Sequence, residues 1–240
     1  MNKIIISVEG NIGVGKSTFT QIIKNAFENS CVVTEPVDVW KSMVDMDGDN
    51  ILNKFYKDTD RWAYTFQNLA CITRMIKMEE SIKDSKSQYI FLDRSIGTDK
   101  NVFEKMLYDN KKISEIEHNM YNLWCDFYHK YVRSETFNII IYLRCNPNTA
   151  YERIMKRNRD EEKNISLEYL SDVHKYHEQW LITDDDNMKV IIIDCDKDFE
   201  NDISYQEYII IQVKSELSIF FQKQFYDVDN FSGMFTNSYC

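Results

Sequence analysis

The sequence predicts an α/β fold in which helices cover both faces of a five-stranded parallel sheet. Short apolar runs rich in Ile, Val and aromatic residues alternate with longer helical patterns, and this order is typical of parallel strands joined by helical crossovers. The apolar runs show little polar alternation, which indicates strands buried on both faces. Only 6 Gly and 2 Pro occur in 240 residues. We therefore expect no linker, one domain over residues 1–224 and a tail over 225–240.

Each expected element has its own local pattern. The strands are Ile-, Val- and aromatic-rich runs at 3–8, 31–34, 88–93, 138–143 and 189–194. The helices are expected at 16–29, 59–84, 97–109, 112–134, 147–157, 166–182 and 205–224. The tail from Phe225 has aromatic residues but no period, so we expect it to be loosely ordered or packed on a neighbour.

The first expected strand leads into a glycine loop that has the spacing of a phosphate-binding P-loop, and a helical run follows it. The glycines allow backbone N–H groups to point at an anion, and the helix N-terminus adds partial positive charge. Lys16 is expected to reach the terminal phosphates of a nucleoside triphosphate, and the Ser17 hydroxyl to bind Mg²⁺. An ordinary glycine turn is disfavoured because both flanks have the right character. The candidate nucleotide-binding residues here are Gly10, Asn11, Gly13, Gly15, Lys16, Ser17 and Thr18.

A carboxylate follows the second expected strand, in the turn Glu35-Pro36-Val37, with Trp40 shortly after. Ligands of parallel sheets bind at the carboxyl ends of the strands, and a carboxylate there can take a proton from an attacking hydroxyl. Taken alone, a surface glutamate beside a turn-forming proline explains the segment better.

The helix expected at 59–84 carries Gln67, Ala70 and Arg74 on one face, because they are three and four residues apart. The paired donor and acceptor of Gln67 suit the edge of a nucleobase. Arg74 could reach a neighbouring base atom or a carboxylate. A polar stripe facing solvent is the alternative.

Asp93-Arg94-Ser95 close the third expected strand. An aspartate at this place is typical of one that coordinates Mg²⁺ or orders its water, and Arg94 could hold the reacting hydroxyl and phosphate. Asp99 and Phe103 are four apart and can share a face of the next helix. The alternative is a helix N-cap by Asp or Ser.

A basic cluster of Arg153, Lys156, Arg157 and Arg159 precedes the acidic run 160–162. In a protein of net charge −10, such a cluster favours an anionic ligand, and the Arg guanidinium fits phosphate oxygens. We interpret residues 153–162 as a lid that closes over phosphates, in preference to a helix whose charges pair with each other.

The composition limits which binding partners and which cellular compartment we expect. The net charge of −10 and the pI near 5.0 argue against a polymeric nucleic acid. No apolar run approaches the length of a membrane span, and the N-terminus enters a strand without a signal-peptide pattern. The 6 cysteines are scattered without CxxC pairs, which fits reduced thiols rather than a disulfide framework or zinc site. We therefore expect an intracellular, cytoplasmic protein with no membrane partner.

Together these segments closely resemble the deoxynucleoside kinase family, which includes kinases of deoxycytidine, deoxyguanosine and deoxyadenosine. The Glu-Pro-Val turn, the FQxxA…R helix, the (E/D)RS motif and the RxRxEE lid occur in family order from the P-loop to about Phe199. The resemblance implies a P-loop kinase fold and transfer of the γ-phosphate of ATP, or of another triphosphate, with Mg²⁺. The acceptor would be the 5′-hydroxyl of a deoxynucleoside, in the salvage that supplies DNA precursors. It also implies a homodimer, for which the aromatic run Tyr121 to Tyr131 is suitable; ordinary core is the alternative.

The resemblance also implies residue roles. Glu35 would take the proton from the 5′-hydroxyl, Gln67 would read the base, and Tyr56 and Glu162 would grip the 3′-hydroxyl. The implied catalytic residues are Lys16, Glu35 and Arg94. The implied substrate-binding residues are Glu35, Trp40, Tyr56, Phe66, Gln67, Arg74, Arg94, Asp99, Phe103 and Glu162. Beyond the P-loop, the implied donor-binding residues are Arg153, Arg157, Arg159, Asp198 and Phe199. The implied Mg²⁺ ligands are Ser17 and Asp93.

The Arg74–Asp99 pair implies a preference for deoxycytidine, deoxyadenosine and deoxyguanosine over thymidine, because a buried pair polarises the base pocket. Two residues depart from the family pattern. Asp93 stands where many animal members have Glu, and Phe55 stands where a smaller or more flexible residue is common, so its bulk could trim the pocket.

Two other functions fit parts of this pattern. A nucleoside monophosphate kinase of the thymidylate type shares the P-loop, the Asp-Arg motif and an Arg lid, but Glu35 would repel an acceptor phosphate. A non-catalytic binding subunit of the same fold is disfavoured because Lys16, Glu35 and Arg94 are all present.

Overall fold

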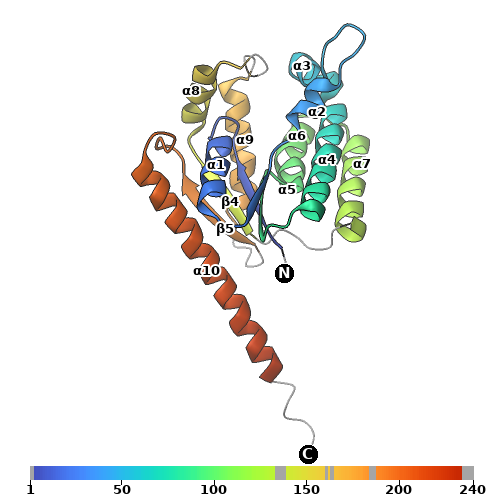
Figure 1. Ribbon diagram of the computed structural model, residues 1–240. Helices are drawn as coiled ribbons and strands as arrows, with labels where there is room; N and C mark the ends of the chain where they lie inside the picture. The colour runs from blue at the N-terminus through green and yellow to red at the C-terminus, as the bar shows by residue number, and fades with distance from the viewer. Residues whose placement is uncertain (1–2, 133–138, 160–161, 163–164, 184–187, 234–240) are drawn as a thin grey trace, which may run out of the picture. The chain divides into compact units, whose positions relative to one another are not determined.

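The computed structural model describes residues 3–132, 139–159, 162, 165–183 and 188–233, with side chains described up to residue 222. It divides into two compact units, Met1–Lys197 and Asp198–Cys240 (Figure 1). Among the described residues, no helix has the length and apolar character that crossing a membrane requires.

The first unit contains a five-stranded sheet in the order β2-β3-β1-β4-β5, and all neighbouring strands are parallel. Every predicted strand is confirmed, with ends shifted by no more than two residues. The strands are β1 (Ile4–Gly10), β2 (Ser30–Val33), β3 (Tyr89–Asp93), β4 (Ile139–Arg144) and β5 (Lys189–Asp194). Because β1 lies at the centre, the loop that follows it opens in the middle of the carboxyl edge.

Helices cover both faces of the sheet, as the unbroken apolar strands predicted. On one face, Ile90 and Leu92 pack against Met78 of α4 (Thr59–Asp84) and Cys125 of α7 (Glu115–Phe127). Figure 1 shows these two helices side by side. Phe91 points to the opposite face, because successive side chains of a strand alternate. There its ring lies 5.3 Å from that of Phe27, at the end of α1 (Lys16–Ala26).

Of the other predicted helices, α8 (Pro147–Arg157) has the predicted bounds, and α9 (Leu167–Leu181) is one residue shorter at each end. Two short helices were not predicted, α2 (Val37–Ser42) and α3 (Ile51–Lys57). Elements of 6 and 7 residues span too few turns to show a helical period.

Two predicted helices are interrupted by π-helical turns. The segment predicted at 97–109 consists of α5 (Ile96–Thr98), the π-helix η1 (Asp99–Glu104) and α6 (Lys105–Asp109). In the segment predicted at 112–134, α7 is followed by the π-helix η2 (Tyr128–Val132). Such π-helical turns are rare and occur frequently at functional sites.

The second unit contains the helix α10 (Ile203–Gly233). The prediction that regular structure ends at 224 is therefore wrong for residues 225–233. The sequence from Phe225 to Ser232 contains neither glycine nor proline, so no residue there strongly disfavours a helix, and the helix ends at Gly233. The rest of the predicted tail, 234–240, lies outside the described residues.

Candidate active site

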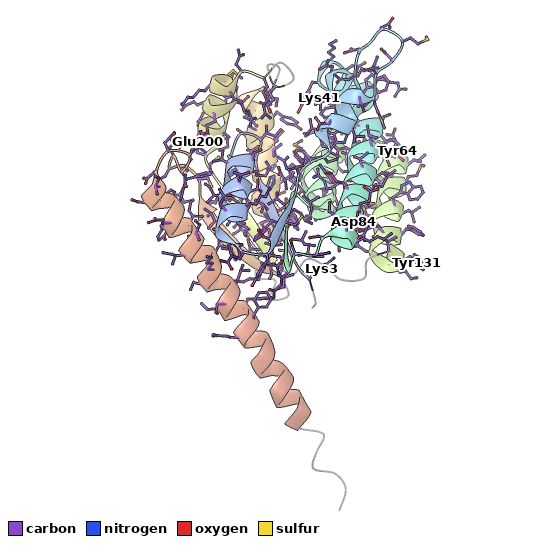
Figure 2. All side chains as sticks on the ribbon, viewed as in Figure 1. Lys3, Lys41, Tyr64, Asp84, Tyr131 and Glu200 are labelled. Carbon is purple, nitrogen blue, oxygen red and sulfur yellow. The ribbon has the colours of Figure 1, made fainter. Side chains whose placement is uncertain are left out.

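A cavity of about 170 Å³ lies at the carboxyl edge of the sheet. Every residue predicted to hold the deoxynucleoside lines it, as do both predicted Mg²⁺ ligands. On the donor side, the lining includes Gly13, Gly15, Lys16, Ser17, Arg157 and Arg159. Lys41 of α2, labelled in Figure 2, is also among the lining residues.

The P-loop connects β1 to α1 and depends on glycine at two tight positions. Gly10 has φ 146°, and a Cβ there would lie 2.5 Å from the carbonyl oxygen of Leu143. Gly13 has φ 80°, and its Cβ would lie 2.5 Å from the carbonyl oxygen of Ala150. Because both clashes are with backbone, any larger residue would displace the loop.

Lys16 folds back over this loop. Its Nζ donates to the carbonyl oxygens of Gly10 at 3.2 Å and Asn11 at 3.0 Å. Burial, together with the charge of Arg94, lowers the pKa of Lys16 to about 8. Its ammonium group is therefore held by weak neutral acceptors, which anionic phosphate oxygens can replace.

Two residues predicted to bind the nucleotide donate hydrogen bonds that hold the loop in place, and their predicted role toward the nucleotide stays a prediction. Asn11 Nδ2 donates to the carbonyl oxygen of Leu170 at 2.8 Å, which ties the P-loop to α9. Arg153 Nη1 donates to the carbonyl oxygens of Cys195 at 2.7 Å and Val14 at 3.3 Å. The structure therefore does not bring the Arg153 guanidinium to the cavity.

Glu35 lines the cavity and lies two residues after β2. Its Oε1 accepts hydrogen bonds from Arg94 Nη1 at 2.8 Å and Arg74 Nη2 at 3.0 Å. Burial acts to raise the pKa of Glu35, but the charges of Arg94, Arg74 and Lys16 outweigh it and lower the pKa to about 2. The carboxylate is therefore ionised at neutral pH.

All three guanidinium nitrogens of Arg74 donate hydrogen bonds, one of them to Glu35. Its Nε donates to Asp99 Oδ2 at 2.8 Å, and its Nη1 donates to the carbonyl oxygen of Asp93 at 3.0 Å. Arg74 is 5% exposed and Asp99 is 1% exposed. The predicted Arg74–Asp99 pair is thus formed and buried, and it also orients Glu35, which the spacing of the residues did not predict.

Arg94 follows β3 in a left-handed backbone conformation, with φ 65°. Besides contacting Glu35, it donates from Nη2 to the carbonyl oxygen of Gly10 at 3.2 Å, and its guanidinium lies 5.2 Å from the centre of the Phe103 ring. Arg94 therefore bridges the P-loop, Glu35 and the aromatic wall.

The far end of the cavity is aromatic with one polar group. The rings of Phe55 and Phe66 stack at 4.8 Å, and Trp40 meets Phe66 edge to face at 5.3 Å. Gln67 is 3% exposed, and its Oε1 accepts no hydrogen bond from the described residues. A buried polar atom of this kind indicates a ligand that supplies the missing partner.

Asp93 and Ser17 fit a magnesium ion. Asp93 Oδ1 is buried and has no hydrogen-bond partner among the described residues. Burial, assisted by the charge of Glu35, raises the pKa of Asp93. One carboxylate and one hydroxyl match the few protein ligands that Mg²⁺ takes beside phosphate oxygens and water.

The lid prediction falls partly on residues 160–161, which lie outside the described residues. Arg157 Nη2 donates to Glu162 at 2.6 and 2.7 Å, and Arg159 lies 3.9 Å from the same carboxylate. Burial raises the pKa of Tyr56, and the nearby Tyr169 and Glu162 raise it further. Tyr56 and Glu162 both line the cavity, and their predicted shared role stays a prediction.

Some predicted residues lie elsewhere, and some lining residues were not predicted. Thr18 does not line the cavity, and Asp198 and Phe199 belong to the second unit, so their predicted contact with the donor base stays a prediction. Leu52, on the same face of α3 as Phe55 and Tyr56, could have been found from that spacing. The unpredicted lining residues are Ile12, Val37, Lys41, Leu52, Ala70 and Tyr169.

Comparisons with known proteins agree on one family. The family model "Deoxynucleoside kinase" matches residues 6–218. The chain is 34% identical over 238 residues to deoxycytidine kinase 2 of Gallus gallus, covering 89% of this chain and 90% of the relative. It is 32% identical over 233 residues to mitochondrial deoxyguanosine kinase of Xenopus laevis, with 88% of each chain covered. A probable deoxycytidine kinase of fowlpox virus is 35% identical over 216 residues, covering 89% of this chain and 88% of the relative.

Proposed function

The chain belongs to the deoxynucleoside kinase family and is a nucleoside phosphotransferase of deoxynucleoside salvage, and we propose that it transfers the γ-phosphate of ATP to a deoxynucleoside 5′-hydroxyl activated by Glu35. One observation carries this proposal. Glu35 is held as a carboxylate by two buried arginines, between the P-loop and the aromatic end of the same cavity. A negative group there suits a neutral hydroxyl acceptor and repels an acceptor phosphate.

Glu35 has two oxygens with different tasks. Oε1 is occupied by Arg94 and Arg74, and Oε2 is the oxygen that can accept the hydrogen bond of the 5′-hydroxyl. With a pKa of about 2, Glu35 is a weak base. Its main contribution is therefore to orient the hydroxyl, and it takes the proton as the new O–P bond forms, as loose phosphoryl transfer allows.

The donor side is supplied by the P-loop, Lys16 and the lid. Backbone N–H groups and Lys16 would hold the β- and γ-phosphates, and Arg157 and Arg159 would lie over them. Ser17 and Asp93 would hold the metal. A bound Mg²⁺ would neutralise charge on the phosphate oxygens. Arg94, which contacts both Glu35 and Gly10, would stabilise negative charge on the transferred phosphoryl group.

We propose that the base pocket prefers deoxycytidine, deoxyadenosine and deoxyguanosine to thymidine. Gln67 presents a buried, unpartnered amide oxygen, which suits an amino group on the base, and the buried Arg74–Asp99 pair polarises the pocket. The names of the relatives, deoxycytidine and deoxyguanosine kinases, support the same choice.

The test is a coupled assay with ATP and Mg²⁺ that compares the four deoxynucleosides with their monophosphates. We expect turnover of deoxycytidine or a purine deoxynucleoside, weaker turnover of thymidine and none of the monophosphates. Faster turnover of thymidine would overturn the base assignment alone. Faster turnover of the monophosphates, or no turnover at all, would overturn the proposed acceptor or activity.

We also propose a homodimer formed through α7. This helix exposes apolar side chains at three- and four-residue intervals: Ile116 is 73% exposed, Met120 46%, Leu123 69% and Phe127 51%. Tyr131 continues the row at 66% exposed, near the end of η2 (Figure 2). A surface row of this kind is typical of helix–helix association. Sedimentation equilibrium should give a dimer, and Leu123→Glu should give a monomer; a monomeric wild type would contradict the proposal.

Location and domain organisation are proposed on two further observations. The five described cysteines are all free, which supports a cytoplasmic protein kept in a reducing compartment. The family match spans residues 6–218, which supports a single kinase domain with a lid at 153–162.

A further inference from the structure

Glu9 is a fully buried carboxylate at the end of β1, directly before the P-loop, and 0% of it is exposed. Its Oε1 accepts hydrogen bonds from Ser95 N at 3.0 Å and Ser95 Oγ at 2.6 Å. Its Oε2 accepts a hydrogen bond from the hydroxyl of Thr98. Burying a carboxylate is costly unless its oxygens accept hydrogen bonds, and here both oxygens do so with one short segment after β3.

The segment after β3 lacks the hydrogen bond by which an N-cap side chain usually holds the start of a helix. Ser95 is the N-cap of α5, yet its side chain accepts no hydrogen bond from a helix N–H group. Its hydroxyl is directed to Glu9 instead. The turn that carries Arg94 is therefore fixed from another strand rather than by its own capping residue.

The two neighbours of Glu9 contact Arg94, so three consecutive residues of β1 hold this turn. Arg94 N donates to the carbonyl oxygen of Val8 at 3.0 Å, and Arg94 Nη2 donates to that of Gly10 at 3.2 Å. Arg94 has φ 65°, a conformation that costs free energy for a residue with a side chain and persists only where its surroundings impose it.

We propose that Glu9 is a positioning residue that keeps the turn after β3 fixed, so that Arg94 meets Glu35 while the P-loop stays in register with both. The inference rests on the proposed roles of Arg94 and Glu35. Glu9 itself does not line the cavity. It acts by joining the strand that carries the donor loop to the turn that carries the acceptor-side arginine.

The test compares Glu9→Ala with Glu9→Gln in the full-length enzyme. Alanine leaves the Ser95 N–H without an acceptor, and we expect kcat to fall about 100-fold, the loss typical of a misplacement near one ångström. Glutamine keeps one acceptor oxygen for Ser95, so kcat should fall only about three- to tenfold. KM for ATP and for the deoxynucleoside should stay within about threefold in both variants.

Tyr142→Phe is the matched control. Tyr142 on β4 is the strand partner of Glu9, and the change removes its 2.7 Å hydrogen bond to Glu178 while the contacts of Glu9 with Ser95 and Thr98 stay in place. It should lower the unfolding temperature without changing kcat. The proposal is overturned if Glu9→Ala lowers stability but keeps kcat, or if Glu9→Gln loses as much as Glu9→Ala.

If Glu9→Ala does not fold, Glu9→Gln decides alone. A threefold or larger loss of kcat, about the smallest change worth interpreting, supports the proposal, provided that stability falls no more than in Tyr142→Phe. An unchanged kcat overturns it. An active wild type with unaffected Glu9 variants would refute only the role of Glu9, whereas an inactive wild type would refute the proposed function.

Discussion

The acceptor and donor sides of the cavity are constructed in different ways. On the acceptor side, Glu35, Arg74 and Asp99 are tied together by hydrogen bonds of 2.8–3.0 Å, and Arg74 and Asp99 are almost fully buried. On the donor side, the Arg157 and Glu162 side chains pair with each other while 34% and 14% exposed, and the Arg159 side chain is 55% exposed.

This difference shows which charges are fixed in advance. The acceptor-side charges already have permanent partners, so they need no rearrangement when a nucleoside binds, which is the condition for strong electrostatic stabilisation. The donor-side cations have temporary partners: Lys16 bonds to carbonyl oxygens of its own loop and Arg157 to a neighbouring carboxylate. Binding of the triphosphate is expected to replace these partners and complete the site.

The largest effect should come from the fixed side. Glu35→Gln keeps the shape of the side chain but removes the charge that orients the hydroxyl, so we expect kcat to fall by roughly 10²–10⁴. Steady-state kinetics at saturating ATP measures it. Asp38→Asn, a charge removal on the exposed side of α2, is the control and should be neutral. A nearly normal kcat for Glu35→Gln would mean that the fixed carboxylate does not act in the reaction.

The buried pair should show the cost of breaking a permanent contact. Asp99→Ala leaves Arg74 buried without its main partner and should lower the free energy of unfolding by roughly 3–5 kcal/mol. Arg74→Met combined with Asp99→Ala should recover part of this loss, because both charges are gone.

The double variant should also raise the thymidine-to-deoxycytidine ratio of kcat/KM by about tenfold or more. Urea unfolding and a two-substrate assay test both points, and an unchanged ratio would remove the pair from base selection.

The donor side should be sensitive to alkaline pH. Because burial and Arg94 lower the pKa of Lys16 to about 8, its charge is present below that pH and is lost as the pH rises through it. kcat/KM for ATP reports the free enzyme and should therefore decline about tenfold per pH unit above that value. Glu35, with a pKa of about 2, should add no acidic decline in the neutral range.

Lys16→Arg stays charged throughout the measured range, so its residual activity should show no such decline. If the wild type and Lys16→Arg have the same profile, the alkaline decline belongs to another group, and Lys16 is not the temporary cation described above.

The smallest effect is expected at the lid. Arg157→Gln removes a partly exposed ion pair, so the free energy of unfolding should change by less than about 1 kcal/mol. KM for ATP should nevertheless rise about fivefold, because the guanidinium is lost from the phosphate site. Thermal unfolding and ATP titration separate the two quantities. A large loss of stability would show that the lid pair is as permanent as the acceptor-side pair.

Much of this site could be predicted because its residues carry local signals. The P-loop is recognisable from eight consecutive residues, and Gln67 and Arg74 share a helix face by spacing alone. The motifs at Glu35 and Asp93 follow strands, and parallel strands bring their carboxyl ends to one edge. Spacing did not show where Arg153 points: it lies four residues before Arg157, and its guanidinium reaches backbone carbonyls of the P-loop and of the segment after β5.

The sequence by itself determined the five strands, the glycine loop and the residue types that gather at the carboxyl edge, because periodicity and turn chemistry act over a few residues. Only the tertiary structure decided which charges meet. Glu35 and Arg94 are 59 residues apart, and Glu9 and Ser95 are 86 apart. Those contacts depend on the strand order β2-β3-β1, which brings three separate segments together. Burial then sets the pKa of each group, and no local pattern encodes it.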